Sequence, residues 1–237
     1  MAVRTLLGKL EQRGLVVLPP RRGLSPNRHR LTAPPLRSWD TRRIEGSLRE
    51  LGALQIREVS TQSSERAQLR SALATFHYLG YRSPVGETLQ YGVYDAQGRL
   101  LSALIFGAAA WKCAARDRWI RWSPEQRERG LGLLANNSRF LILPWVKVPR
   151  LASWILSRIA RRIDGDWQAK YGHRILALET FVETGRFTGT CYQAANWIHV
   201  GATTGRSRQD RTRTVQVPVK EVYLYPLSPK SREGLCR

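Results

Sequence analysis

The segment LQYGVYDAQGRLLSALIF (residues 89–106) contains two apolar, β-prone runs on either side of Asp95-Ala96-Gln97-Gly98. Two runs of this kind joined by a short turn predict a β-hairpin. We therefore expect a sheet that includes residues 89–106, with the other elements of the chain arranged around it.

Helices and strands are expected on both sides of this hairpin. Ser64 is a suitable N-cap for a helix over residues 64–76, whose apolar residues have helical spacing. The sequence SPEQ at residues 123–126 predicts the start of a second helix, over 123–134. The remaining predicted elements are strand 139–143, helix 150–163, strand 175–182, short helix 191–197, strand 199–201 and a final sheet segment over 223–227. Such a mixed order is typical of an α/β or α+β fold with one central sheet.

The first 23 residues differ in character from the rest of the chain. Val3, Leu6, Leu7 and Leu10 have the spacing of one helical face, and Gly14 suits a left-handed helix end. An expected strand over 15–18 and a basic tip at 21–23 follow. We interpret residues 1–23 as a partial winged helix-turn-helix, its trailing helix and wing, a unit that usually holds nucleic acid. Residues 24–60 are then a linker, and residues 61–237 form the main domain.

The chain is strongly basic, with 39 Lys and Arg residues against 18 Asp and Glu residues and a net charge of +21. This excess gives a positive surface, for which phosphate backbones are the commonest partner. A soluble protein with generic charge is the alternative. Neither an apolar run of about 20 residues nor a signal peptide is present, so we expect no membrane role. Three widely spaced cysteines, without zinc spacing, indicate a cytosolic protein without a metal site.

Residues 89–206 resemble the acyltransferase fold of the GCN5-related superfamily. The resemblance lies in the hairpin, a strand ending at Leu143-Pro144, a long helix, the strand LETFV (178–182), a tyrosine-bearing short helix and the ending NWIHVG (196–201). It implies an acyltransferase-like α/β fold, a mixed sheet flanked by helices. Those enzymes hold the coenzyme A pyrophosphate on a Gly-rich turn at the start of the long helix. Here residues 146–150 read VKVPR, and Pro149 lacks an amide donor. We therefore expect no acetyl-CoA and no cofactor.

A second, more specific resemblance covers most of the chain. The motifs HYLGY (77–81), NNSRFLILPWVKVPRLAS (136–153), FTGTCYQAANWIHVGATTGRSRQDR (187–211) and VKEVYLYPL (219–227) are similar to the Druantia A protein family, as are residues 107–122 and 178–182. That family is linked to bacterial anti-phage defence and to transposase-annotated mobile elements. The resemblance implies defence-system or transposition proteins as further partners.

Three residues are candidates for catalysis. Glu179 lies in an apolar strand, where a carboxylate is a general base or ligand-binding group, or is paired with an arginine. Tyr192 is a candidate general acid or a covalent nucleophile for a DNA phosphate, and the alternative is a packed tyrosine with its hydroxyl satisfied. Cys191 is a candidate nucleophile or a buried, inert thiol.

Several residues are candidates for nucleic-acid contact. The loop GRSRQDRTR offers Arg206, Arg208, Arg211 and Arg213 to phosphates, unless it is only a solvated basic loop. Asn196 and Trp197 suit base recognition and stacking, or are a turn residue beside a core aromatic. Lys112 and Arg116 alternate with Trp111, Trp119 and Trp122 as in a single-strand track, although such tryptophans are as often core. Arg139, next to Asn136 and Asn137, is a further candidate.

The sequence therefore predicts a nucleic-acid-binding protein of a mobile-element or anti-phage system, with DNA favoured over RNA. The alternative is an acyl- or aminoacyl-transferase whose donor is not acetyl-CoA, such as a charged tRNA. A structural module that docks onto a helicase partner is a third interpretation.

Overall fold

The computed structural model describes residues 7, 10–17, 38–59, 64–205 and 217–237, in two units divided after Thr32. In the first unit, helical residues 10–12 lead to Gly14, whose φ is 69°. Leu15 N–H donates to Leu10 O and Gly14 N–H to Glu11 O, each at 2.9 Å. These bonds form a left-handed glycine cap, so the predicted role of Gly14 is confirmed. Residues 15–17 form no strand, contrary to expectation. The rest of the winged-helix arm lies outside the described residues and stays a prediction.

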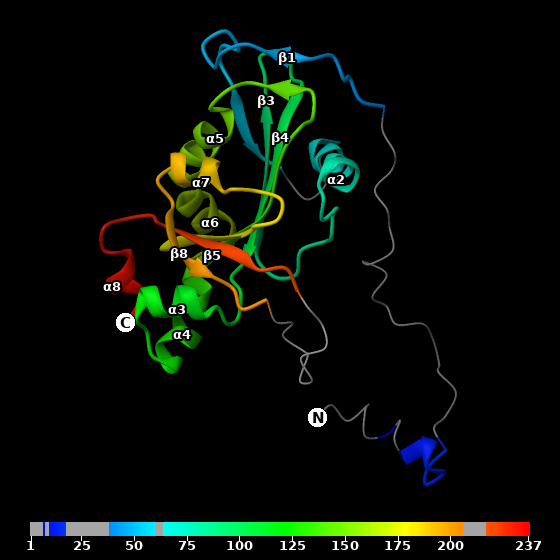
Figure 1. Ribbon diagram of the computed structural model, residues 1–237, viewed down its shortest axis with the longest axis vertical. Helices are drawn as coiled ribbons and strands as arrows, with labels where there is room; N and C mark the ends of the chain where they lie inside the picture. Colours follow the sequence, from blue (N-terminus) through cyan, green and yellow to red (C-terminus); the bar gives the residue numbers. More distant parts are fainter. Residues whose placement is uncertain (1–6, 8–9, 18–37, 60–63, 206–216) are drawn as a thin grey trace. The chain divides into compact units, whose positions relative to one another are not determined.

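The second unit is built on a seven-stranded mixed sheet of order β2-β3-β4-β5-β7-β9-β8 (Figure 1). Every neighbouring pair is antiparallel except β5 and β7, which are parallel. The strands are β2 (Gln55–Glu58), β3 (Thr88–Tyr94), β4 (Leu100–Ala108), β5 (Leu134–Ile142), β7 (Ala177–Glu183), β8 (Ile198–Ala202) and β9 (Lys220–Pro226). Two short parallel strands, β1 (Ile44–Glu45) and β6 (Val146–Lys147), form a separate sheet. The expected hairpin is β3–β4.

Helices cover both faces of the large sheet. In Figure 1, α2 (Ser64–Phe76) lies on one face, and α5 (Leu151–Ala160), α6 (Ile163–Tyr171) and α7 (Thr190–Ala194) lie on the other. The helices α3 (Ala114–Ile120) and α4 (Pro124–Gly130) lie together near the C-terminal helix α8 (Ser231–Leu235). The prediction of an α/β fold with a mixed sheet flanked by helices is confirmed.

Two predicted helices have different ends in the structure. The helix expected over 123–134 begins with a complete capping box between Ser123 and Gln126, but it ends at Gly130. A 3₁₀ turn (Leu131–Leu133) follows, and β5 then starts at Leu134, five residues before the strand expected at 139. The helix expected over 150–163 ends at Ala160, and α6 begins at Ile163.

The parallel pair β5–β7 is short and opens into a gap. The strands pair only from Leu134 to Asn136 on β5, after which each stays bonded to its other neighbour. The β4–β5 ladder shifts at this point, because Phe106 is opposite Asn137 and Ile105 is opposite Arg139. Ser138 is therefore an extra residue in β5. A bulge of this kind bends its strand, which accounts for the separation of β5 from β7.

Candidate functional site

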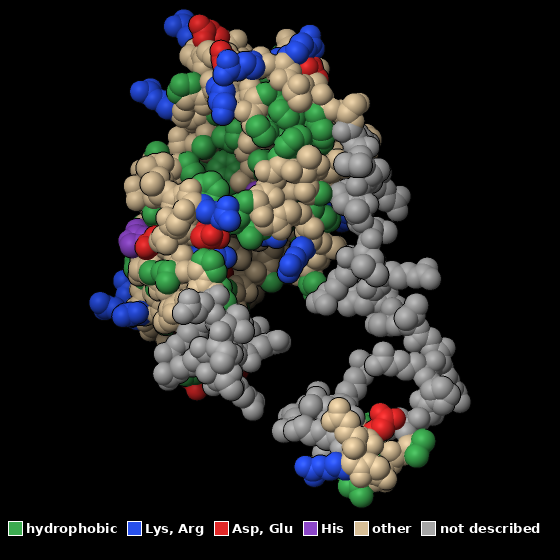
Figure 2. Space-filling model, turned by 45° about the vertical axis from the view of Figure 1, so that its right-hand side comes forward, with side chains coloured by type: hydrophobic (Ala, Val, Ile, Leu, Met, Phe, Trp, Pro, Cys, Tyr) green, Lys and Arg blue, Asp and Glu red, His purple; other side chains and the backbone are tan. Residues whose placement is uncertain are grey.

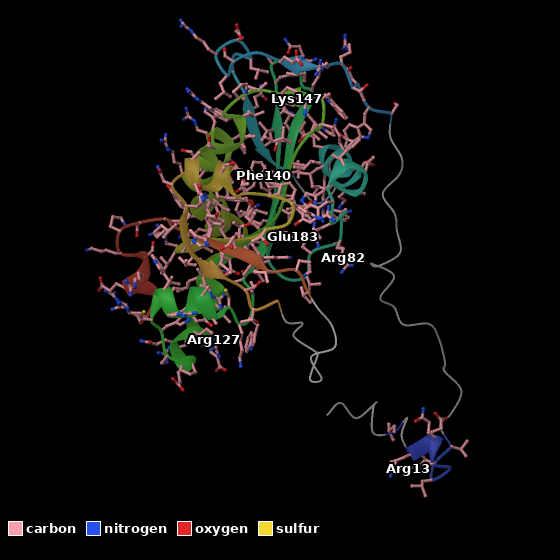
Figure 3. The ribbon with its side chains drawn as sticks, in the orientation of Figure 1. Arg13, Arg82, Arg127, Phe140, Lys147 and Glu183 are labelled. Carbon is pink, nitrogen blue, oxygen red and sulfur yellow. The ribbon has the colours of Figure 1, made fainter. Side chains whose placement is uncertain are left out.

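A cavity of about 680 Å³ lies where β5 and β7 separate. Its walls come from the end of α2, from β5 and β7, from residues 186–189 and from α7. Phe140 on β5 lines it, and Glu183 marks the end of β7 (Figure 3). Ligand-binding clefts commonly have volumes of about 300–1,000 Å³, so this cavity has the size of a nucleotide or cofactor site.

The charged side chains that line the cavity are all basic. They are Arg139, Arg186 and Lys220, and no carboxylate belongs to the lining among the described residues. Arg139 donates from Nε to Gly80 O at 2.8 Å and from Nη1 to Ser138 O at 2.7 Å, and it forms no ion pair with a carboxylate among the described residues. Arg186 is paired with Glu183, at 2.9 Å. This lining favours an anionic ligand.

Aromatic rings stand at the edge of the same cavity. Phe187 and Tyr78 are 51% and 39% exposed, and their ring centroids are 5.3 Å apart. His77 stacks on Tyr78 at 4.9 Å, and the Arg186 guanidinium lies 5.3 Å from the Tyr78 ring. Exposed rings next to cations suit planar, negatively charged ligands such as nucleotides.

His77 is a neutral hydrogen-bond donor in this arrangement. Its Nδ1 accepts from Leu79 N–H at 3.1 Å, which assigns the ring proton to Nε2. Burial, reinforced by the positive charge of Arg139, lowers the pKa of His77 to about 4. The ring is therefore uncharged at neutral pH, and with its Nδ1 lone pair in use it is not set up as a general base.

Tyr192 reaches the cavity from α7 and is tied to β5 and β7. Its hydroxyl donates to Asn137 Oδ1 at 2.7 Å, and Thr180 Oγ1 lies 3.4 Å from the same hydroxyl. The Asn137 amide in turn donates to Ile105 O and Arg139 O. Burial raises the pKa of Tyr192, so the phenol keeps its proton. All three side chains line the cavity.

Neither nucleophile candidate is activated at neutral pH. Cys191 lines the cavity, but burial raises the pKa of its thiol to about 11. Nucleophilic attack needs the thiolate or phenolate, and the structure favours the protonated form of both Cys191 and Tyr192. The cavity is thus equipped to bind an anion and to donate protons or hydrogen bonds.

Glu179 lies on the other side of β7, away from the cavity. It has no exposed surface, accepts from Ala110 N–H at 2.6 Å and is paired with Arg116 at 2.9 Å. Burial raises the pKa of its carboxyl, and the Arg116 guanidinium acts against that rise. The arginine-paired alternative is therefore the one observed. Arg116 is itself fully buried, which corrects its expected place on a nucleic-acid surface.

The remaining candidates are not brought together. Trp197 is 4% exposed and packs against Tyr192, with ring centroids 5.1 Å apart, while Asn196 is exposed in a left-handed conformation with φ 62°. Lys112 and Trp111 are exposed, but Trp122 is buried, so the expected track is not continuous. Arg206, Arg208, Arg211 and Arg213 lie outside the described residues.

The sequence pointed to four of the residues that line the cavity, namely Tyr192, Cys191, Asn137 and Arg139. It did not point to His77, Arg186 and Lys220 as site residues, although the motif HYLGY includes His77.

The start of α5 does not suit a coenzyme A pyrophosphate, and the described residues include no metal-binding cluster. Pro149 has no N–H and Arg150 has φ 64°, so the start of α5 does not offer the row of backbone amides that a pyrophosphate needs. No group of three or more His, Cys, Asp or Glu residues within the described ranges could hold a metal ion. None of the helices described is long and apolar enough to cross a membrane.

Comparison with known proteins gave one family and a set of solved structures. The family model described as "Druantia protein DruA" matches residues 37–234. Among solved structures, the spermidine N-acetyltransferase from Vibrio cholerae in complex with CoA and spermine is similar, with a TM-score of 0.49 and 9% identity over 73% of this chain and 95% of that one. The V. cholerae spermidine/spermine N-acetyltransferase SpeG with manganese ions has a TM-score of 0.47 and 9% identity, over 75% and 95%. Comparison with curated proteins gave no match.

Proposed function

This chain belongs to the family of the Druantia protein DruA, and on that premise we propose that it binds nucleic acid, with DNA as the favoured form, in a bacterial anti-phage defence system or mobile element. The observation that carries the proposal is the cavity between β5 and β7, whose charged lining residues are all basic and whose edge is aromatic. Other proteins of the same system are proposed as further partners.

The distribution of charge over the chain supports a polyanionic partner. The net charge is +21, and Figure 2 shows basic side chains over several parts of the visible surface, with fewer acidic ones. A surface of this kind attracts a phosphate backbone over long distances. The cavity then adds a local feature, because Arg139, Arg186 and Lys220 face one space.

The form of the cavity favours a single strand over a duplex. A cavity of about 680 Å³ admits one or two nucleotides, whereas a duplex is too wide to enter. Phe187, which is 51% exposed, offers ring surface on which an unpaired base can stack. We therefore place the end or an unpaired segment of a strand in the cavity, with its phosphate near the three cations.

The base of the predicted arginine loop lies beside the cavity. Val217 N–H donates to Gly205 O at 3.1 Å, so the chain enters and leaves residues 206–216 at one point. Thr203 N–H donates to Lys220 O at 2.8 Å, and Lys220 lines the cavity. This connection supports the proposal that Arg206, Arg208, Arg211 and Arg213 contact the phosphates next to the bound nucleotide.

A titration with a single-stranded oligonucleotide over a series of salt concentrations tests the proposal. We expect Phe187→Ala to weaken binding by about 5- to 150-fold, the equivalent of the ~1–3 kcal/mol that base stacking contributes. Lys220→Gln should lower the slope of log affinity against log salt by about 0.7, the value for one phosphate on a single strand. The matched control is Trp111→Ala, which removes an aromatic side chain that is 47% exposed and does not line the cavity. Equal losses for Phe187→Ala and Trp111→Ala, or binding that does not depend on salt, contradict the proposal.

A second function, acyl or aminoacyl transfer from a donor such as a charged tRNA, is favoured by Tyr192. Tyr192 lines the cavity, and its hydroxyl keeps its proton, which a general acid requires and which it would redirect from Asn137 Oδ1 to a bound substrate. Tyr192→Phe should then abolish transfer while oligonucleotide binding is retained. Transfer activity at the wild-type rate in this variant would exclude the role.

A further inference from the structure

Helix α5 has one buried side and one basic side. Leu151, Ile155, Leu156 and Ile159 are buried beneath it. The opposite side carries four residues at spacings of four, four and three: Arg150, Trp154, Arg158 and Arg161. Helical geometry places residues with this spacing together on one side, which here is the outward side. We call these four residues, with Ser157, the α5 face. Between Leu151 and Ala160 the helix contains no acidic residue.

The three arginines of the α5 face carry uncompensated charge. Arg150, Arg158 and Arg161 are exposed, and within the described residues none of them is paired with a carboxylate. The neighbouring Arg162 is different, because it is held by Asp166 at 2.7 Å. Basic groups without acidic neighbours on a regular helix form a site for a partner with regularly spaced negative charges.

The aromatic residue of the α5 face, Trp154, is half-buried. The Arg158 guanidinium lies 5.4 Å from the centre of the Trp154 ring, and Trp154 also packs against the main core. A single-strand site needs open rings for unpaired bases. Because Trp154 is half-buried between the Arg158 guanidinium and the core, the α5 face offers mainly guanidinium and hydroxyl donors, the groups that contact phosphate and sugar.

We propose that the α5 face binds the phosphate backbone of duplex nucleic acid, through Arg150, Arg158, Arg161 and the Ser157 hydroxyl. The inference rests on the proposed function and adds a second contact to it. Arg150 and Arg161 are separated by about 16 Å along the helix, enough to span several phosphates. Forked guanidinium groups bind phosphate in bidentate fashion.

The α5 face and the cavity are on different sides of the same helix. Ala152 lines the cavity, and it lies about 200° around the helix from both Arg150 and Trp154. One nucleic acid can therefore be held at two points, with its duplex part on the α5 face and an unpaired end in the cavity.

The test compares duplex binding of the full chain and of the triple variant Arg150→Gln, Arg158→Gln, Arg161→Gln over a range of salt concentrations. The slope of log affinity against log salt should fall by about 2.7, which is 0.9 for each of three phosphate contacts. The matched control is Arg49→Gln, Arg118→Gln, Arg121→Gln, which removes the same charge from exposed arginines on other elements. Thermal unfolding of both triple variants confirms that they are folded, since surface substitutions of this kind shift stability by about 0.5 kcal/mol or less.

Three results would overturn the inference. The first is an unchanged slope in the α5 variant, and the second is an equal fall in the control, which indicates net charge alone. The third is an α5 variant that no longer binds polyglutamate but still binds duplex as the wild type does. This result would assign the α5 face to an acidic protein partner. If one of these results is obtained but Phe187→Ala still weakens single-strand binding, the inference fails and the proposed function is retained. Absence of binding to any nucleic acid removes both.

Discussion

The Tyr192 hydroxyl donates to Asn137 Oδ1 at 2.7 Å and so joins α7 to β5 across the opening between β5 and β7. The two residues are 55 positions apart in the sequence, and both line the cavity. Tyr192 is 7% exposed and Asn137 is 4% exposed, so water does not readily replace either partner. The same contact therefore holds the wall of the cavity and orients the Tyr192 hydroxyl.

Tyr192→Phe should destabilise the fold. The variant leaves Asn137 Oδ1 buried without a donor, which costs about 1–3 kcal/mol. Urea unfolding followed by fluorescence measures the free energy of unfolding. Tyr225→Phe is the control, because Tyr225 is half-buried and its hydroxyl has no hydrogen-bond partner among the described residues. Equal losses in the two variants would show that the bond to Asn137 adds no stability.

Glu179→Ala should destabilise the fold more strongly, because it removes the fully buried carboxylate that is paired with the buried Arg116 guanidinium and leaves Asp117, at 2.8 Å, as its charged partner. Breaking a buried ion pair costs about 3–5 kcal/mol, which lowers the melting temperature of a chain of this length by about 6–20 °C. The double variant Glu179→Leu, Arg116→Met removes both charges and should recover much of the loss. A Glu179→Ala protein with wild-type melting temperature and no activity would restore the catalytic interpretation of Glu179.

The features that depend on neighbours in sequence could be predicted. The hairpin 89–106, the helix 64–76 and the capping box at Ser123 follow from turn residues, helical spacing and caps, and all three are observed. The alternation of strand side chains also placed Glu179 opposite to Thr180 correctly. It could not say which of the two sides meets the cavity, because that depends on the helices that cover each face.

The composition of the cavity could not be predicted, since its parts meet only in the folded chain. His77 comes from the end of α2 and Lys220 from β9, and no local pattern connects them. The opening itself depends on the extra residue Ser138, which carries no turn signal in the sequence. The break between α5 and α6 was missed for a similar reason, since residues 160–163 contain neither glycine nor proline.

His77 should make stability fall in mildly acidic solution. Its pKa is about 4 in the folded state and 6.5 in the unfolded chain, so between these values the unfolded chain binds more protons. The contribution of the neutral His77 ring to the free energy of unfolding is therefore fully present above pH 6.5, and it is lost as the pH falls toward 4. Carboxylates titrate in the same range, so the comparison is with His77→Asn, which retains an acceptor for Leu79 N–H. The difference in unfolding free energy between wild type and variant should change between pH 7 and pH 4.5, and a constant difference would contradict the assignment.

Gly189→Ala should disturb the cavity through Tyr223. Gly189 precedes α7 with φ 73°, and a Cβ there would lie 2.5 Å from the Tyr223 hydroxyl oxygen. The left-handed backbone alone costs a non-glycine residue about 1–2 kcal/mol, and the contact adds to this by displacing α7 and Tyr192. Gly172→Ala is the matched control, since Gly172 has φ 79° and a Cβ there would have no atom within 4 Å. We expect urea unfolding to show a larger loss for Gly189→Ala than for Gly172→Ala, and only the former to weaken oligonucleotide binding. Equal losses would mean that backbone strain is the whole effect and that Tyr223 has room to move.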